Sequence, residues 1–224
     1  MDFPAGLFPL SVSLTFDGLM LLALGVSVAR VGWRRLDRSV LNAWLGAMVL
    51  VMVLWTLRDE YRPGISFHLL GMAILTLMMG PWLAMLAAAL VMAGAELSRG
   101  GSLLPVGLDW FICGAVPIMF TRGALWLTQR YLPANYFVYF FFNAFLAGGL
   151  SMTLAGLSGV LALGIAGIHG WDVLFDEAMP YYFLLSWSEA FTTGLMMAIL
   201  VVYRPRWVCT FDDGRYLADR DDEF

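Results

Sequence analysis

The sequence predicts an all-α, polytopic membrane protein with about seven transmembrane helices. Hydrophobic residues make up 61% of its 224 residues, and its mean hydropathy is +0.78. Charged residues make up only 13%. A soluble domain of this length cannot bury so much apolar surface, so most of that surface must face lipid or other membrane helices. We therefore expect a multi-pass protein of the inner (plasma) membrane, with a transmembrane domain at 1–203 and a charged cytoplasmic tail at 204–224.

The expected helices follow from apolar segments at 9–30, 39–57, 66–80, 82–97, 109–128, 136–168 and 180–203. The third and fourth segments are short, and Gly80-Pro81 separates them. One crossing takes about 20 residues, so this region is too long for one ordinary span and short for two. We expect a hairpin of two short helices, with Ser66 capping the first. In transporters, such broken segments tend to surround the binding site.

Arginine positions favour seven crossings over six. With seven, one face of the membrane receives Arg30, Arg34, Arg35, Arg38, Arg122, Arg130, Arg204, Arg206, Arg215 and Arg220. The other face receives only Arg58, Arg62 and Arg99. Merging the hairpin into one span would scatter this charge across both faces. The positive-inside rule therefore predicts an N-terminus outside and a C-terminus in the cytoplasm.

The composition also excludes several functions. The chain contains no lysine, so it has neither a Walker A loop nor a lysine Schiff base. We find no nucleophile–base pair and no two-histidine metal motif, so we expect no catalytic residues and no enzyme activity. In so apolar a chain, the net charge of -4 gives no indication of nucleic-acid binding.

Ionisable residues inside a membrane are costly, and each one needs a physical reason. Four of these residues stand out, namely Asp17, His68, Asp109 and Glu189, and Glu96 ends the fourth segment. Imidazole and carboxylate ligands together suit a divalent cation such as Ni, Co or Zn. Structural roles are the alternative: Asp109 could cap its helix, Glu189 could bond a neighbouring helix, and His68 could be a buried, hydrogen-bonded histidine. If Glu189 is structural, Glu189→Gln should fold and keep any bound metal.

Three motifs resemble a known family. The stretch "GISFHLLGMAILTLMMGPW", residues 64–82, is similar to a signature of the CbiM/NikM family, the substrate-specific membrane subunits of energy-coupling-factor cobalt and nickel importers. The start "MDFPAGLFP" resembles the family's N-terminus in Met1, Pro4 and Gly6. The segment "WSEAFTTG" resembles a family segment with a Glu-Ala pair near the last helix.

The resemblance implies a metal site on the outer side of the membrane. The family's ligands are the N-terminal amine, the backbone nitrogen and imidazole of the second residue, and the histidine of the His-Leu-Leu-Gly segment. By position these ligands are Met1, the second residue and His68. Here the second residue is Asp2, which replaces the imidazole with a carboxylate, and Ala5 stands where the family has an acid. The loss of a nitrogen ligand puts selectivity for Ni or Co in doubt.

The resemblance also implies a role and partners. The leading hypothesis is a substrate-binding membrane subunit for divalent metal uptake, with Ni or Co as substrate. Such a subunit would work with a separate membrane coupling subunit and cytoplasmic ATPases. The alternative, motivated by Asp2 and the acidic tail, is a diverged structural or assembly subunit of a membrane complex that no longer transports.

Overall fold

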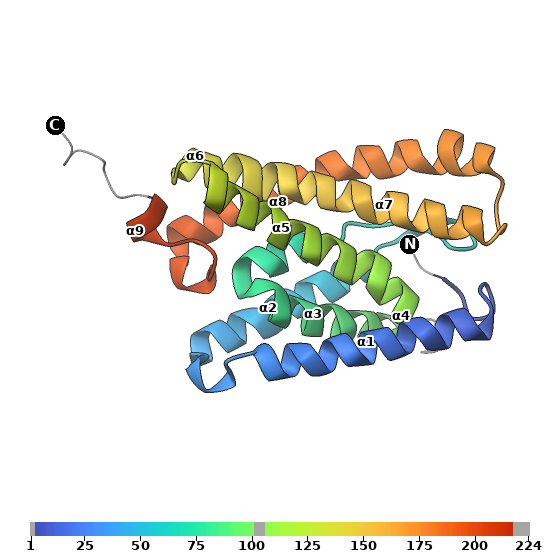
Figure 1. The fold of residues 1–224 in the computed structure, drawn as a ribbon, viewed down its shortest axis with the longest axis horizontal. Helices are drawn as coiled ribbons and strands as arrows, with labels where there is room; N and C mark the ends of the chain where they lie inside the picture. Colours follow the sequence, from blue (N-terminus) through green and yellow to red (C-terminus); the bar gives the residue numbers. More distant parts are fainter. Residues whose placement is uncertain (1–2, 101–105, 217–224) are drawn as a thin grey trace.

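The computed structural model describes residues 3–100 and 106–216. Within them, six helical segments are long and apolar enough to cross a membrane: Leu10–Arg30, Arg38–Thr56, Met72–Ser98, Val106–Tyr131, Tyr136–Ile165 and Val173–Tyr203. They lie lengthwise beside one another, with α7 and α8 along one edge of the bundle and α1 along the opposite edge (Figure 1). The predicted all-α, multi-pass membrane fold is confirmed.

The first three segments are α1 (Leu10–Arg30), α2 (Arg38–Thr56) and α3 (Met72–Ser98). Each of the last three segments begins with or contains a π-helical stretch. The fourth consists of α4 (Val106–Asp109), η2 (Trp110–Ala115) and α5 (Val116–Tyr131). The fifth consists of α6 (Tyr136–Val138), η3 (Tyr139–Leu146) and α7 (Ala147–Ile165), and the sixth of η4 (Val173–Ala178) and α8 (Met179–Tyr203). Short elements connect or follow them: η1 (Trp33–Arg35), β1 (Asp59–Arg62), β2 (Ile65–Phe67), η5 (Pro205–Trp207) and α9 (Asp213–Tyr216).

The α3 segment is a hairpin of two short helices. Gly80 interrupts it with φ 78° and ψ 168°, a conformation open to glycine but not to other L-residues, and the following Pro81 has no N–H to continue the hydrogen-bond ladder. The chain reverses there, because His68 and Glu96, from before and near the end of α3, line one cavity while Gly80 lines another. The break predicted from Gly80-Pro81 is therefore present. We refer below to the His68 end and the Gly80 end of the bundle.

The predicted start of this hairpin was wrong. Helix α3 begins at Met72 rather than at 66, and its N-cap is Gly71 in a left-handed conformation with φ 68°. Ser66 does not cap it, because Ser66 lies in β2, which pairs antiparallel with β1. A remote carboxylate takes over the capping role, as described below.

The α3 hairpin occupies the centre of the bundle. About 61% of its most apolar window is buried, against 11% for α1 and 22% for α2, and it contacts α1, α2, α5, α7 and α8. Its buried face is built from alanine, leucine and methionine, including Ala84 and Ala88, whose small side chains allow close helix contact. This central position carries the residues at both ends of the hairpin into the protein interior.

Residues 205–216, which we call the C-terminal strap, pack against the hairpin at the Gly80 end (Figure 1). The Cys209 N–H donates to the Met78 carbonyl (2.8 Å), and the Thr210 hydroxyl donates to the Leu77 carbonyl (2.6 Å). These carbonyls end the first short helix, where the break at Gly80 removes their helical partners. The strap thus supplies hydrogen bonds that the broken helix cannot make for itself.

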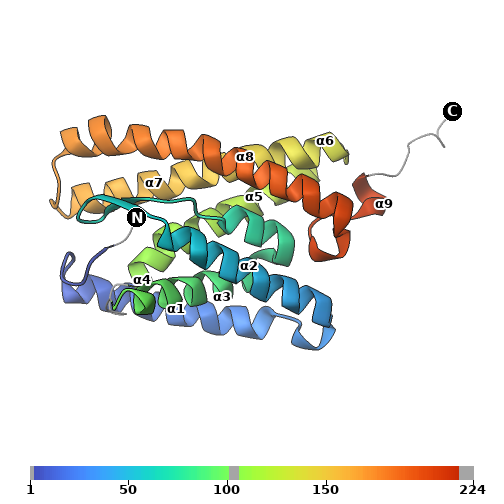
Figure 2. The same cartoon turned by 180° about the vertical axis from the view of Figure 1, so that it is seen from behind.

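Arginines separate between the two ends as seven crossings predict. At the Gly80 end, Arg122 and Arg215 line one cavity with Trp82, over whose ring Arg30 lies. At the opposite end, Arg58 and Arg99 line the cavity that contains His68. The view from behind shows the same arrangement, with the strap at one end of the bundle and the β1–β2 hairpin toward the other (Figure 2).

Candidate functional site

His68 lies in an extended segment between β2 and α3, and it is buried. Its ring packs against the Trp55 indole with a centroid distance of 4.6 Å. Its Nδ1 lies 3.1 Å from the Leu69 carbonyl oxygen. Because a carbonyl can only accept, this hydrogen bond assigns a proton to Nδ1.

The segment after His68 is held in place by the α8 carboxylate Glu189. One Glu189 oxygen accepts the Leu70 N–H (2.9 Å) and the other accepts the Gly71 N–H (2.8 Å). The Trp55 indole N–H donates to the Leu70 carbonyl (3.1 Å). Glu189 is buried, so its charge is desolvated and its two hydrogen bonds offset part of that cost. Two of the sequence motifs, His-Leu-Leu-Gly and Trp-Ser-Glu-Ala, therefore bind each other.

Asp109 brings the N-terminal segment to the same place. Its two oxygens lie 3.1 and 3.3 Å from the Phe3 N–H, and both residues are buried. Asp109 and His68 line one cavity of about 20 Å³. A space of that size accommodates one ion or one water and excludes an organic ligand. The alternative in which Asp109 caps its helix was wrong, because the helix begins at Val106 and the carboxylate bonds the distant Phe3.

Asp17 performs the capping instead. Its Oδ1 accepts the Gly107 N–H (2.8 Å) in the first turn of the helix that carries Asp109. Helix α1 approaches this turn so closely that a Cβ at Gly107 would collide with backbone atoms of Phe16 and Asp17. Asp17 is half-buried and does not line the His68 cavity.

Both signs of charge surround the His68 cavity. Arg58, Glu96 and Arg99 line it together with Asp109, and Glu96 forms an ion pair with Arg99. Burial lowers the pKa of the Arg58 guanidinium from its ordinary value, and the charge of Arg99 lowers it further. The sequence placed Arg58 and Arg99 in outer loops without indicating that they reach the cavity that His68 lines.

Among the described residues, no three His, Cys, Asp or Glu side chains come together in a group that could hold a metal ion. The predicted ligands Met1 and Asp2 lie outside the described residues. Of the residues singled out from the sequence, the structure brings together His68 and Asp109. It places Glu189 behind the His68 segment and Asp17 behind the helix that carries Asp109.

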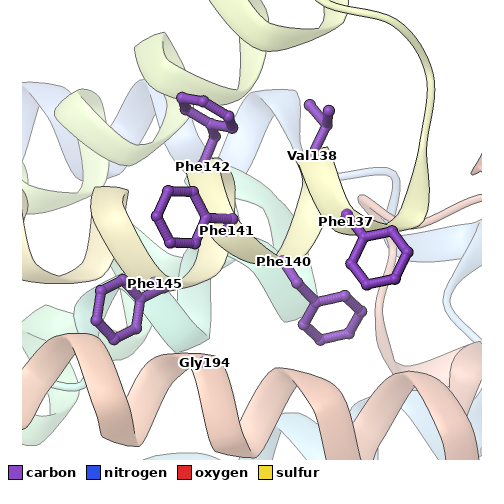
Figure 3. Close-up of a pocket in the computed structure, with 7 residues that line it drawn as sticks. All are labelled: Phe137, Val138, Phe140, Phe141, Phe142, Phe145 and Gly194. Atoms are coloured by element: carbon purple, nitrogen blue, oxygen red, sulfur yellow. The ribbon is translucent and has the colours of Figure 1, made fainter.

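A different cavity lies on the surface of the bundle, between η3 and α8. It has a volume of about 610 Å³ and is lined by Phe137, Val138, Phe140, Phe141, Phe142, Phe145 and Gly194. Figure 3 shows the rings of Phe140 and Phe145 extending toward α8 on either side of Gly194. This lining offers no polar side chain to a metal ion, and phenylalanines on such a surface are suited to contact lipid tails.

Sequence reasoning missed Trp55, which fixes both the ring of His68 and the carbonyl of Leu70. It also missed two contacts that fix the β1–β2 hairpin to the last helical segment. Arg62 pairs with Glu177 (2.9 Å), and the Tyr182 hydroxyl donates to the Ser66 carbonyl (3.1 Å). The only available signal was that several motifs resembled one family, which suggested shared function but gave no pairing between them.

Two solved structures have the same fold as this chain. A truncated transition metal transporter, known from a crystal structure, has the same fold with a TM-score of 0.79 and 19% identity over 91% of this chain and 99% of that one. A second crystal structure of a transition metal transporter gives 0.78 and 19%, over 89% and 92%. No curated protein matches the chain in sequence.

The sequence match to a family is extensive. Residues 2–207 match CbiM, described as the cobalt uptake substrate-specific transmembrane region. That range includes the six membrane-spanning segments and, apart from Met1, all three motifs on which the resemblance rested, so the predicted membership is confirmed. This chain belongs to the CbiM family, whose members are membrane components of transition-metal uptake.

Proposed function

We propose that this protein is the substrate-binding membrane subunit of an energy-coupling-factor importer for a divalent transition metal of the cobalt and nickel type. One observation carries the proposal. His68 and Asp109 line the same ion-sized cavity, and Asp109 holds the backbone of Phe3 there. The N-terminal segment and the histidine of the family motif thus meet at one place.

The proposed metal ligands are His68, Met1 and Asp2. Consecutive Cα atoms are about 3.8 Å apart, so covalent geometry keeps Met1 within about 8 Å of Phe3. His68 would contribute Nε2, since its Nδ1 proton is directed to the Leu69 carbonyl. Met1 would contribute its amine, and Asp2 a carboxylate oxygen or its backbone nitrogen. The carboxylate is a harder ligand than the imidazole it replaces, which weakens the preference for Ni or Co.

The proposed transport role requires partners. The chain contains no lysine and hence no Walker A loop, so cytoplasmic ATPases would have to supply the energy. A membrane coupling subunit would connect them to this chain. We further propose that the Gly80 end faces the cytoplasm, on the basis of its arginines. Reporter fusions at Ser102 and after Phe224 should then read opposite sides of the membrane, and matching sides would contradict the topology.

One observation favours the alternative, a diverged structural or assembly subunit. Arg58 and Arg99 line the His68 cavity, and their two positive charges oppose the entry of a dication. Under this alternative the site is a charge-balanced internal contact that holds the N-terminal segment in the fold, and the metal has been lost.

Isothermal titration with Ni(II) and Co(II) separates these functions. The wild type should bind one ion, His68→Ala should abolish binding, and Asp2→His should strengthen it by restoring a nitrogen ligand. Affinity should rise with pH, because the amine, with an ordinary pKa near 8, must lose its proton to bind. His169→Ala is the matched control, because His169 contacts the Pro63 carbonyl and does not line the cavity. Equal binding by the wild type and His68→Ala would transfer support to the alternative.

A further inference from the structure

A polar cavity lies at the Gly80 end, far from the proposed metal site. It has a volume of about 570 Å³ and lies between the tip of the α3 hairpin, helix α5 and the C-terminal strap. Its lining is rich in hydrogen-bond donors: Arg122 on α5, Arg215 on α9, and Trp82 at the hairpin tip. The proposed transport function assigns no role to it.

Arg122 is the central feature of this cavity. It is half-buried in a membrane-spanning helix, and within the described part of the chain it forms no hydrogen bond and no ion pair. An arginine at such a position is costly unless an anion or water compensates its charge. Its five N–H donors are arranged to receive two oxygens of a carboxylate or phosphate at once.

The neighbouring groups do not neutralise Arg122. Asp212 also lines the cavity, but its Oδ1 accepts the Arg215 N–H at 2.8 Å and it forms no ion pair with Arg122. Cys209 is exposed as a residue, yet a Cβ on Gly80 would lie only 3.7 Å from its sulfur, and burial of the thiol raises its pKa to about 11. The thiol is therefore uncharged near neutral pH. With Arg215 and Asp212 balancing each other in charge, the cavity keeps a net positive charge.

Aromatic rings place this cavity at the depth of the lipid headgroups. At the same end, Arg30 lies over Trp82 (5.6 Å) and Arg130 over Trp126 (5.4 Å). Arg204, directly before the strap, lies over Trp207 (5.7 Å). Tryptophan and arginine concentrate at membrane–water interfaces, where the ring is half in the apolar phase and the cation faces phosphate groups. The cavity combines the same features, because Trp82, Pro81 and Leu125 line it beside the arginines.

We propose that this cavity binds the phosphate of an anionic phospholipid headgroup, with Arg122 as the principal anchor and Arg215 as a second donor. Arg215 already gives one N–H to the Gln129 carbonyl (2.7 Å), which fixes its guanidinium and leaves its other donors for the ligand. The apolar part of the lining receives the glycerol region of the lipid. Such a lipid would bridge the hairpin tip, α5 and the strap, and so stabilise the closed arrangement of the Gly80 end.

Thermal unfolding of the delipidated, detergent-solubilised protein tests this site. Added phosphatidylglycerol should raise the midpoint by several degrees, because a ligand that binds the folded state stabilises it. Phosphatidylcholine should raise it much less. Arg122→Gln keeps the length and polarity of the side chain but removes the charge, and it should abolish the phosphatidylglycerol shift. Arg130→Gln is the matched control, since Arg130 is exposed on the same helix, does not line the cavity, and should leave the shift intact.

Each other outcome overturns the proposal. Binding would be non-specific if the two lipids raised the unfolding midpoint equally. It would also be non-specific if phosphatidylglycerol raised the midpoint of Arg122→Gln as much as that of the wild type, or if Arg122→Gln and Arg130→Gln lost the shift equally. An equal shift with inorganic phosphate would assign the site to a soluble anion. If Arg122→Gln does not fold, native mass spectrometry of the wild type from mixed phosphatidylglycerol and phosphatidylcholine nanodiscs decides. A retained phosphatidylglycerol supports the site, while statistical retention of both lipids contradicts it.

Discussion

The two ends of the α3 hairpin leave opposite kinds of backbone group without a helical partner, and different chemical groups bond them. At the His68 end, the backbone N–H groups of Leu70 and Gly71 are satisfied by the carboxylate of Glu189, on the distant helix α8. At the Gly80 end, the carbonyls of Leu77 and Met78 are satisfied by neutral donors from the strap. Free N–H groups attract an anion and free carbonyls need donors, so the polarity of the helix decides which partner each end takes.

The same rule explains the three acidic residues that the sequence singled out within its predicted helices. Glu189, Asp109 and Asp17 each accept a backbone N–H from a part of the chain at least 90 residues away. None of the three forms a metal-binding group among the described residues. In this protein, intramembrane carboxylates position backbone segments, and the proposed metal ligands come from the segments they position.

The largest effect is expected from Glu189→Ala. It leaves two buried N–H groups without an acceptor, which costs roughly 2–6 kcal/mol at about 1–3 kcal/mol for each. Thermal unfolding in detergent should show a large fall in midpoint, or the variant should fail to fold. Glu177→Gln, which removes the partly exposed ion pair with Arg62 and alters the exposed contact with the Tyr61 hydroxyl, is the control and should leave the midpoint nearly unchanged. Similar midpoints for the two variants would refute the capping role.

The structure changes the expectation for Glu189→Gln. The sequence suggested that the amide would preserve the hydrogen-bonding shape. However, the two Glu189 oxygens each accept a different N–H, and an amide has only one oxygen. Its NH₂ would face a second donor, so Glu189→Gln should cost roughly 1–3 kcal/mol. A midpoint equal to that of the wild type would restore the original expectation.

Most of the fold and part of the site could be predicted from the sequence. Whether a feature could be predicted depended on whether its physical cause is local in the chain. Composition and the length of the apolar segments predict membrane helices, because a segment that crosses the bilayer has no water to bond its backbone and must satisfy its N–H and C=O groups itself. Gly80-Pro81 predicts a break because its cause is local. The pairings of Glu189 with Leu70 and Asp109 with Phe3 span more than 100 residues, and only the packed bundle determines them. A single sequence carries no signal for such contacts.

Gly107→Ala tests the contact between the Asp17 carboxylate and the Gly107 N–H by introducing a steric clash. Its Cβ would collide with the backbone of Phe16 and Asp17, so α1 must move away and lose the Asp17 hydrogen bond. Overpacking against backbone costs roughly 1–3 kcal/mol. Gly123→Ala on α5 is the control, because nothing lies within 4 Å of its Cβ position. A fall in midpoint for Gly107→Ala alone supports the close contact, and equal midpoints contradict it.

Asp109 gives a sharper contrast with Glu189. Both Asp109 oxygens approach a single N–H, that of Phe3, so one acceptor suffices. Asp109→Asn should therefore behave nearly as the wild type in unfolding, whereas Asp109→Ala leaves a buried donor and costs roughly 1–3 kcal/mol. If Phe3 holds the N-terminal ligands at His68, metal affinity in titration should fall in Asp109→Ala and persist in Asp109→Asn. Loss of affinity in both would give the carboxylate charge itself a role in binding.

The smallest effect is expected at the Gly80 end, from Thr210→Val. The substitution keeps the shape of the side chain but removes a hydroxyl that donates to the Leu77 carbonyl and lies 2.7 Å from the Tyr139 hydroxyl. The Met78 carbonyl keeps its bond from the Cys209 N–H, and the Trp207 indole N–H still donates to the Ser39 hydroxyl, so the strap stays attached. The expected cost is about 1 kcal/mol. Thr15→Val, which removes an exposed hydrogen bond within α1, is the control for hydroxyl loss.

Because the partners at the Gly80 end are neutral, Thr210→Val should perturb folding much less than Glu189→Ala does. A larger loss at Thr210 would show that the strap, rather than the remote carboxylate, is the stronger constraint on the hairpin.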